Sequence, residues 1–399
     1  MPYNRTPVIV SAARTAIGRF GGTLSQIPAP ELGAAAIRAA VARAGVDPAS
    51  VDEVFMGCVV PAGQGQAPAR QASIKAGIPP TVGAVTLNKV CGSGLKTVMT
   101  AAALIKAGDG DVYVAGGMES MNMGPYLLQR GRTGYRLGHG ELLDATVHDG
   151  LWCAFEDQHM GNSAEWIARE YGVSREAQDQ FALESHQKAS AAIEAGRFKE
   201  EIVPIEIPQR KRDPLIFDTD ENPRKDTALE KLSRLKPVFQ QDGTVTAGNA
   251  SAITDGAAAT VVMSWARAEE LGIQPLARIT GYAYAAVEPL KVFVAPVFAI
   301  RKLLQKTGTT LGDYDLIEVN EAFAAQCLGD GIMLADDGWR WGNVNVNGGA
   351  IALGHPIGCS GTRVLVTLLH ALKQRNLKTG FATLCLGGGE AVALSVEIV

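Results

Sequence analysis

Residues 92–120 read GSGLKTVMTAAALIKAGDGDVYVAGGMES: a helix start of small residues, an Ala/Leu-rich helical run, and an apolar strand that ends in glycines. The same order returns at 359–391 as CSGTRVLVTLLHALKQRNLKTGFATLCLGGGEA, so that Ser93 and Ser360 correspond at an offset of 267 residues. Self-similarity of this kind indicates a duplicated structural unit. Because strand-like and helical runs alternate, we predict two copies of one α/β unit.

The duplication reaches further along both copies. PVIVSA, ELGAAAIRAAVARAG and VDEVFMG near the N-terminus match ARITGYAYA, APVFAIRKLLQKTG and YDLIEVNEA near the C-terminus. In this alignment Cys91 corresponds to Gly358, and Gly57 corresponds to Asn320. Equivalent loops of duplicated units tend to meet at their shared interface, where ligand sites commonly lie. The residues that carry chemistry are therefore expected on these loops.

The middle of the chain has a different composition. It is richer in charge, proline and tryptophan, so we interpret it as an insertion rather than a third repeat. Within it, Ser174 followed by Glu176 predicts a helix start, because a Ser cap and nearby acids suit the positive end of a helix. The predicted division is an N-terminal half at 1–121, completed by about 248–273, an inserted domain at 122–247, and a C-terminal half at 274–399.

The overall charge excludes some classes of partner. The 37 basic and 41 acidic residues leave a formal charge of −4, which favours neither nucleic acid nor an anionic membrane surface. The six cysteines form no CxxC pair and no metal-like spacing with the six histidines, which speaks against zinc and against a disulfide framework. We therefore predict a chain without a metal.

The same features bear on compartment. Unpaired cysteines suit the reducing cytoplasm, which is the expected location. The first 30 residues hold three arginines and no acid before Glu31, a composition that is also compatible with a transit peptide. PVIVSAART, however, is also typical of a β-strand running into a loop. No apolar stretch reaches the roughly 18 residues that a membrane span needs.

Cys91 has two interpretations. If a helix begins at Gly92 or Ser93, the thiol lies at a helix N-terminus, where free N–H groups and the helix dipole favour a thiolate and make it a nucleophile. Cysteine is also among the most buried residue types and packs as a small hydrophobe. This segment alone favours the packed interpretation slightly.

Three other junctions offer chemistry of the same kind. His355 lies on a Gly-His-Pro turn before a second small-residue helix start, and it is either a positioned base or a structural histidine. Cys385 ends an apolar strand and precedes three glycines, whose N–H groups are able to hold an oxyanion or to form a tight turn. Asn320 ends another strand, where an amide orients a water or a histidine, or caps its own turn. All of these positions are junctions of the duplicated unit, so together they indicate a catalytic site more strongly than any one of them does alone.

At these residues the chain resembles the thiolase family, essentially from Pro7 to the C-terminus. The resemblance implies two stacked βαβαβαββ halves in an αβαβα sandwich, with an inserted loop domain that binds coenzyme A. The stretches that carry it are NKVCGSGL (88–95), GGMES (116–120), AGNASAITDGAA (247–258), NEAFA (320–324), NVNGGAIALGHPIGCSG (345–361) and CLGGG (385–389).

The resemblance also implies a mechanism. Cys91 would accept an acyl group from a CoA thioester after activation by His355. Cys385 would remove the α-proton of a second acyl-CoA and return it in the cleaving direction. One oxyanion site would be His355 with a water held by Asn320, and the other would be the backbone N–H groups of Cys91 and Gly387. No metal or redox cofactor is implied beyond the CoA thioester.

Contacts to CoA are expected from the insertion and from nearby loops. The CGSG and HMG stretches favour a short-chain acetyl-CoA C-acetyltransferase of fatty acid metabolism over a degradative 3-ketoacyl-CoA thiolase with a broader range. More distant alternatives are a non-catalytic acyl-CoA-binding relative and a thiol-based redox sensor. The residues to which the resemblance assigns CoA contacts are Leu151, His159, Met160, Arg224, Ser251 and Phe323.

The sequence departs from the usual family pattern at two places. Ala252 replaces the glycine usual after AGNAS, and Glu390-Ala391 follow the glycines where the family usually has Met or Gln and then Gly. Glu390 is expected to alter the packing behind the oxyanion site or the proton environment of Cys385.

The segment 124–150 resembles the loop that pairs dimers of short-chain thiolases, or else it is a mobile surface loop. We therefore expect a homotetramer built as a dimer of dimers.

Overall fold

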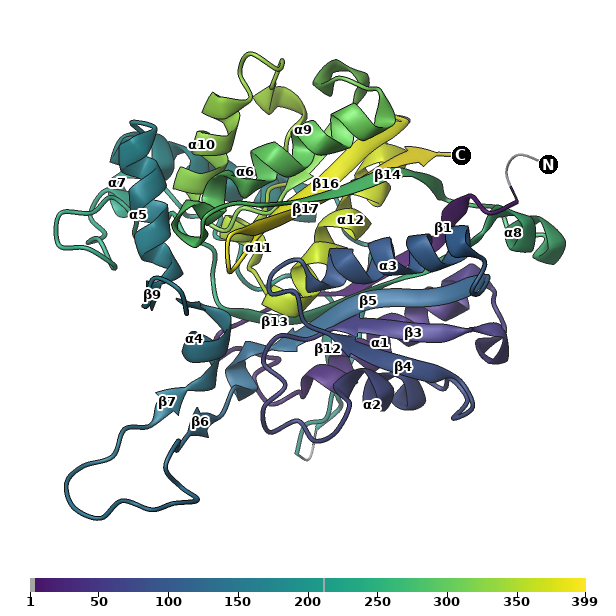
Figure 1. Cartoon of the computed structure of the whole chain (residues 1–399), viewed down its shortest axis with the longest axis horizontal. Coiled ribbons are helices and arrows are strands. Elements are labelled where there is room, and N and C mark those ends of the chain that lie inside the picture. The colour runs from purple at the N-terminus through teal and green to yellow at the C-terminus, as the bar shows by residue number, and fades with distance from the viewer. Residues whose placement is uncertain (1–3, 211) are drawn as a thin grey trace.

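A computed structural model describes residues 4–210 and 212–399, and it contains the duplicated α/β unit expected from the repeat (Figure 1). Both copies have the order strand, helix, strand, helix, then a central helix and a closing pair of strands, and the first copy has one further strand before its central helix. The first copy comprises β1 (Pro7–Thr15), α1 (Ala29–Ala44), β3 (Glu53–Gly57), α2 (Pro68–Lys75), β4 (Gly83–Leu87), α3 (Ser93–Ala107), β5 (Val112–Ser120) and β13 (Thr254–Ser264). The second comprises β14 (Ala277–Ala286), α9 (Ala295–Thr307), β15 (Leu316–Val319), α10 (Ala324–Met333), α12 (Ile357–Gln374), β16 (Thr379–Leu386) and β17 (Glu390–Ile398).

The strands of both copies are joined by hydrogen bonds in the order β15-β16-β17-β14-β1-β13-β5-β3-β4. The copies meet where β1 pairs with β14 at Val8↔Arg278 and Ile9↔Ala277. The second copy has a bridge at Ile317↔Val344 where the first copy has its edge strand β4. PVIVSAART forms β1, in which every residue is buried, so the interpretation of this stretch as a strand is confirmed.

Five layers follow from where the apolar side chains are buried. Helices α1 and α2 cover the outer face of the first copy, and α9 covers the outer face of the second. Helices α3 and α12 lie between the two sets of strands and share one apolar cluster with them (Figure 1). Nearly every residue of α12 is buried, including the polar side chains of Thr362, Arg363 and Thr367. The predicted αβαβα sandwich is confirmed.

The two central helices cross at glycines that the repeat had already paired. A Cβ atom on Gly94 would lie 2.7 Å from the backbone nitrogen of Thr362, and a Cβ on Gly361 would lie 2.3 Å from that of Leu95. Real Cβ atoms do not approach that closely, so only glycine lets the helices come together here. This close approach places the N-terminal ends of α3 and α12, with Cys91 and His355 just before them, next to each other.

The inserted segment is built of short elements around two longer helices. Ser174 caps α6 as expected, because its Oγ accepts a hydrogen bond from the N–H of Ala177 (3.2 Å). The insertion comprises β6 (Tyr126–Leu127), β7 (Leu143–Asp144), α4 (Ala145–Gly150), β8 (Trp152–Cys153), β9 (Gln158–His159), α5 (Met160–Glu170), α6 (Arg175–Glu194), β10 (Ile202–Val203), β11 (Ile205–Ile207), β12 (Leu215–Phe217) and α7 (Leu229–Leu232). The remaining short elements are β2 (Gly18–Arg19), α8 (Trp265–Leu271) and α11 (Ala350–Leu353).

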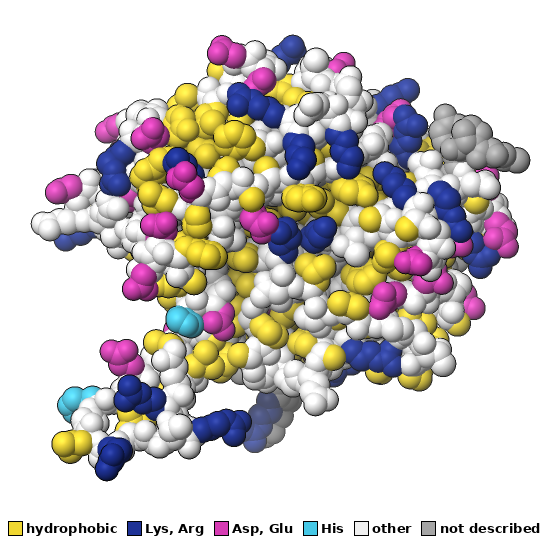
Figure 2. Space-filling view, viewed as in Figure 1, with side chains coloured by type: hydrophobic (Ala, Val, Ile, Leu, Met, Phe, Trp, Pro, Cys, Tyr) yellow, Lys and Arg dark blue, Asp and Glu magenta, His cyan; other side chains and the backbone are white. Residues whose placement is uncertain are grey.

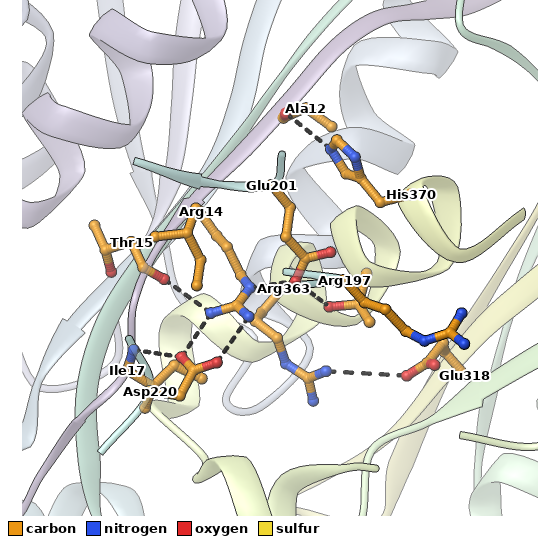
Figure 3. Close-up of polar contacts among 12 residues, drawn as sticks. Ala12, Arg14, Thr15, Ile17, Arg197, Glu201, Asp220, Glu318, Arg363 and His370 are labelled. Carbon is orange, nitrogen blue, oxygen red and sulfur yellow. Dashed lines mark hydrogen bonds and ion pairs between the residues drawn. The ribbon is translucent and has the colours of Figure 1, made fainter. Parts of the chain in front are cut away.

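A buried group of charges fastens the insertion to the core (Figure 3). Arg14 of β1 donates from Nε to Glu201 (2.6 Å), and from both terminal nitrogens to the carboxylate of Asp220 (2.7 and 2.9 Å). In the same group, Nη1 of Arg363 in α12 lies 3.9 Å from Oε2 of Glu318 in β15. All five side chains are almost fully buried. A charge that lost its partner here would be left inside the protein, so we expect these contacts to be held firmly.

The segment between β6 and β7 extends away from the body of the molecule (Figure 1). It carries exposed basic side chains, which Figure 2 shows grouped on the protrusion, and Leu137 within this segment is 99% exposed. Across residues 4–210 and 212–399, no helix combines the length and apolar character that crossing a membrane would require.

Candidate active site

One cavity of about 520 Å³ opens between the two copies and the insertion. Its size falls within the range of sites for small molecules. Cys91, His355, Cys385 and Gly387 line it, and so do all six residues for which CoA contacts were expected. Asn320 is fully buried behind the lining and reaches the cavity through His355. The structure therefore brings together all the site residues named from the sequence.

Cys91 lies directly before the first turn of α3, where the repeat predicted a helix start. The preceding residue, Val90, has φ 45°, a left-handed conformation that is unusual for a β-branched side chain and costs about 1–3 kcal/mol. Asn88 and Ser93 hold it there: the Val90 N–H donates to Asn88 Oδ1 (2.9 Å), and Ser93 Oγ donates to the Val90 carbonyl (2.6 Å). The strained turn presents the thiol of Cys91 to the cavity.

Two opposing effects act on the Cys91 thiol. Burial raises its pKa to about 11, while the backbone N–H groups of Gly387 and of Cys91 itself act to lower it. The more remote carboxylate of Glu119 raises it slightly. The thiol is therefore mainly protonated at neutral pH and needs a base to become a nucleophile.

His355 is set up as such a base. Its Nδ1 lies 2.6 Å from Ser360 Oγ, and that hydroxyl donates its own hydrogen to the Pro356 carbonyl (2.9 Å). Because the serine hydrogen is already used, Nδ1 of the ring carries the proton, and Nε2 keeps a free lone pair. Burial, with a contribution from Arg363, lowers the pKa of His355 to about 3, so the ring is neutral.

Asn320 follows β15 and lies against that free nitrogen. The distance from its Nδ2 to His355 Nε2 is 3.4 Å, and its Oδ1 has no hydrogen-bond partner among the described residues. The next residue, Glu321, fixes this turn because its carboxylate accepts hydrogen bonds from Ser185 of α6 and from Asn345. The amide of Asn320 is thus held in place and able to bind a further polar group.

Cys385 is the last residue but one of β16 and lines the same cavity. It is 2% exposed, and burial, followed by the neighbouring Cys91 and Asp330, raises the pKa of its thiol. The three glycines after it form the tight turn between β16 and β17, in which Leu386 pairs with Glu390. Gly389 has φ +87°, and a Cβ there would lie 2.5 Å from the Val287 carbonyl, so this turn requires glycine. The turn brings the N–H of Gly387 to Cys91.

The expected CoA contacts form the apolar wall and mouth of the cavity. His159 caps α5 through a hydrogen bond from the N–H of Gly161 to its Nδ1 (3.0 Å), and its ring stacks on Phe239 with centroids 4.6 Å apart. Phe323 packs edge-on against Phe239 and Phe293. Arg224 lies near the opening, with its backbone N–H donating to His186 Nδ1 (3.2 Å).

Several residues of the site were not singled out from the sequence. Phe239 and Phe293 line the cavity but lie in stretches without a motif. From the sequence, Ser360 was identified only as the residue that matches Ser93 in the repeat. Its position one helical turn after Pro356 could have indicated a contact between its hydroxyl and His355. Glu119, within GGMES, is fully buried and accepts hydrogen bonds from the N–H groups of Val59, Val60 and Gly358. It ties the start of α12 to the loop after β3.

The two departures occupy defined places. Ala252 lines the cavity, and its carbonyl accepts the N–H of His355 (3.1 Å). Glu390 forms an ion pair with Lys89, two residues before Cys91 (2.6 Å). Within the described part of the chain, no group of three or more His, Cys, Asp or Glu residues is arranged to hold a metal ion. The cavity thus joins two thiols, a neutral imidazole and two N–H groups, a set that suits the transfer of an acyl group.

Comparison with known proteins agrees with the fold. Residues 7–266 match the family model "Thiolase, N-terminal domain", and residues 273–398 match "Thiolase, C-terminal domain". The chain belongs to the thiolase family, whose members are acyltransferases.

Similar proteins span the whole chain. The chain is 58% identical to an acetyl-CoA acetyltransferase of Pseudomonas aeruginosa over 389 residues, and 57% identical to one of Cupriavidus necator over 390 residues; each alignment covers 98% of both chains. Among solved structures, it superposes on the acetyl-CoA acetyltransferase of Bacillus anthracis with a TM-score of 0.96 at 45% identity, over 100% of both chains. The TM-score to that of Syntrophomonas wolfei is 0.97 at 40% identity, again over 100% of both.

Proposed function

We propose that the chain is an acetyl-CoA C-acetyltransferase that condenses two molecules of acetyl-CoA to acetoacetyl-CoA and CoA, and that also runs the reverse cleavage. The observation that carries this proposal is the convergence of Cys91, Cys385 and a neutral His355 on one cavity. The names of the full-length relatives support the substrate.

In the first half of the reaction, Cys91 attacks the thioester carbonyl of acetyl-CoA. Its proton passes to Nε2 of His355, the lone pair left free by the contact to Ser360. The negative charge that develops on the carbonyl oxygen is stabilised by the N–H groups of Cys91 and Gly387. The bond to CoA sulfur breaks, CoA takes the proton, and an acetyl-Cys91 thioester remains.

In the second half, Cys385 passes its thiol proton to Nε2 of His355, and the resulting thiolate removes an α-proton from a second acetyl-CoA. The enolate oxygen then accepts hydrogen bonds from the protonated Nε2 of His355 and from a water bound to Asn320, whose buried Oδ1 is available for that role. The carbanion attacks the acetyl-Cys91 carbonyl and expels the Cys91 thiolate, which takes the proton back from His355 as acetoacetyl-CoA forms. Thiols, imidazole and N–H groups supply every step, so we propose no cofactor beyond the CoA thioester.

The aromatic and apolar wall would hold the pantetheine arm and the acyl group. Leu151, Met160, Ser251 and Phe323 line the cavity near Cys91, and Arg224 at its mouth suits the phosphates of CoA. A protein of this chemistry works in a reducing compartment, and we propose the cytoplasm.

The test is the cleavage of acetoacetyl-CoA by free CoA, followed through the loss of the enolate absorbance. Turnover by the parent and none by Cys91→Ala is the expected result, with mass spectrometry detecting an acetyl group on Cys91. Full turnover by Cys91→Ala would exclude the proposal. Higher kcat/KM on longer 3-ketoacyl-CoA substrates would instead favour a degradative thiolase.

We further propose a homotetramer assembled through the segment 128–142. Its extension from the body and its fully exposed Leu137 suit a contact with another copy. Light scattering should give a tetramer for the parent and a dimer for a chain in which this segment is shortened to a two-residue turn. A parent that scatters as a monomer would contradict the proposal.

A further inference from the structure

An ion pair joins the two loops that face each other across the Cys91 thiol. Lys89 Nζ lies 2.6 Å from Glu390 Oε2, and their side chains are 23% and 35% exposed. Lys89 belongs to the strained turn before Cys91, and Glu390 is the first residue after the turn of Gly387, Gly388 and Gly389. One contact therefore spans 301 residues of sequence and connects the two halves of the thiol environment.

Both loops are held by hydrogen bonds on their own side, and they also pack against each other. On the Cys91 side, the backbone N–H of Lys89 donates to Ser93 Oγ (2.8 Å). On the other side, the Val287 N–H donates to the Gly389 carbonyl (2.7 Å). Between the loops, a Cβ on Gly387 would lie 3.1 Å from Val90 Cγ1, so the backbone of Gly387 already packs against the residue before Cys91. The ion pair closes this contact from the solvent side.

We propose that the Lys89–Glu390 ion pair is a positioning clamp, which keeps the backbone N–H of Gly387 directed at the same point as the N–H of Cys91. The inference rests on the proposed function in so far as that point is the developing oxyanion. Two donors are effective only when both meet one oxygen, and a small displacement of a preorganised donor is costly. Neither side chain touches the reacting atoms.

A purely electrostatic role would leave a different signature. The titratable groups around the thiol are Glu119 of β5, His355 and Cys385, and Lys96 of α3 lies beside the ion pair. Through charge alone, removing the anion of Glu390 would lower the pKa of Cys91, because a nearby negative charge disfavours a thiolate. Through the clamp, the same change would raise that pKa, because the N–H of Gly387 would turn away from the sulfur.

The experiment compares Lys89→Met, Glu390→Gln and the exchanged pair Lys89→Glu/Glu390→Lys with the parent. The matched control is Glu397→Gln, which removes the ion pair with Arg278 at the other end of β17, where side-chain exposure is similar (39% and 34%). Each single change at the clamp is expected to lower kcat for acetoacetyl-CoA cleavage about ten-fold, with KM changed less than about two-fold. The exchanged pair should recover most of kcat, and the control should match the parent.

The second readout does not need turnover. The pH dependence of Cys91 alkylation by iodoacetamide, followed on the Cys91 peptide by mass spectrometry, reports the pKa of the thiol. A higher midpoint in Glu390→Gln supports the clamp, and a lower or unchanged midpoint overturns it. Unchanged kcat in both single variants, or no recovery in the exchanged pair, also overturns it. A parent without turnover would count against the proposed function alone, because the alkylation comparison still decides the clamp.

Discussion

The Nδ1 atom of His355 and the Oγ atom of Ser360 lie 2.6 Å apart, and this contact decides which nitrogen of the ring carries the proton and which keeps a lone pair. Without the hydroxyl, the ring has no partner that holds the proton on Nδ1, and a share of molecules would carry it on Nε2 instead.

Ser360→Ala is therefore expected to lower kcat by about ten- to hundred-fold, because a positioned base contributes about 10²- to 10⁴-fold and the variant loses part of that contribution. The measurement is acetoacetyl-CoA cleavage under saturating substrate. Thr362→Val is the control: it removes another fully buried hydroxyl of α12, one that has no hydrogen-bond partner among the described residues. If both variants lose the same activity, the effect comes from helix packing and not from His355.

Much of the fold was predictable, because the sequence contains two copies of one unit and each copy indicates the same order of elements. The pairing of Ser93 with Ser360 located both central helix starts, and the glycines at the crossing of α3 and α12 allow the close approach of the two helices. Backbone strain and ion pairs between residues distant in sequence were not predictable. Nothing in the sequence around Val90 indicates its left-handed backbone conformation. Lys89 and Glu390 form their ion pair only because the β16–β17 turn folds back beside Cys91.

His186 gives a pH dependence of stability whose sign follows from its surroundings. Burial and the nearby Arg224 lower its pKa to about 4, and its Nδ1 accepts the Arg224 N–H. The unfolded chain takes up a proton near pH 6.5, while the native chain resists it until about pH 4. The contribution is therefore complete above pH 6.5 and is lost as the pH falls through this window.

Urea denaturation at pH 7 and pH 4.5 measures this effect. Between pH 7 and pH 4.5, the free energy of unfolding of the parent should fall by about 2–3 kcal/mol more than that of His186→Asn. The asparagine side-chain oxygen still accepts the N–H of Arg224 but does not titrate. Equal losses in the two proteins would show that His186 does not carry the dependence.

The ion pair of Arg14 with Asp220 should matter for folding more than for catalysis. Asp220→Ala leaves the buried guanidinium with a single carboxylate partner among the described residues, Glu201, and frees the Ile17 N–H that also donates to Asp220 (2.8 Å). The free energy of unfolding should fall by about 3 kcal/mol or more. Glu31→Gln, which removes an exposed ion pair with Lys75, should leave it unchanged within error. A small loss in Asp220→Ala would mean that water reaches Arg14 and replaces the carboxylate.

Leu151 is the residue through which the acyl preference can be tested directly. It lines the cavity and packs in the same apolar cluster as Cys91, Val90 and Ile253, so its side chain limits the space beside the thiol. Leu151→Ala should raise kcat/KM for 3-ketohexanoyl-CoA relative to acetoacetyl-CoA by about ten-fold or more, since each methylene that gains a place contributes on that order. Leu271→Ala, on exposed α8, serves as the control. A parallel fall for both substrates would assign Leu151 to the pantetheine arm, which every acyl-CoA shares, and the limit on chain length would then lie with Ile253 or Ile357 on the same wall.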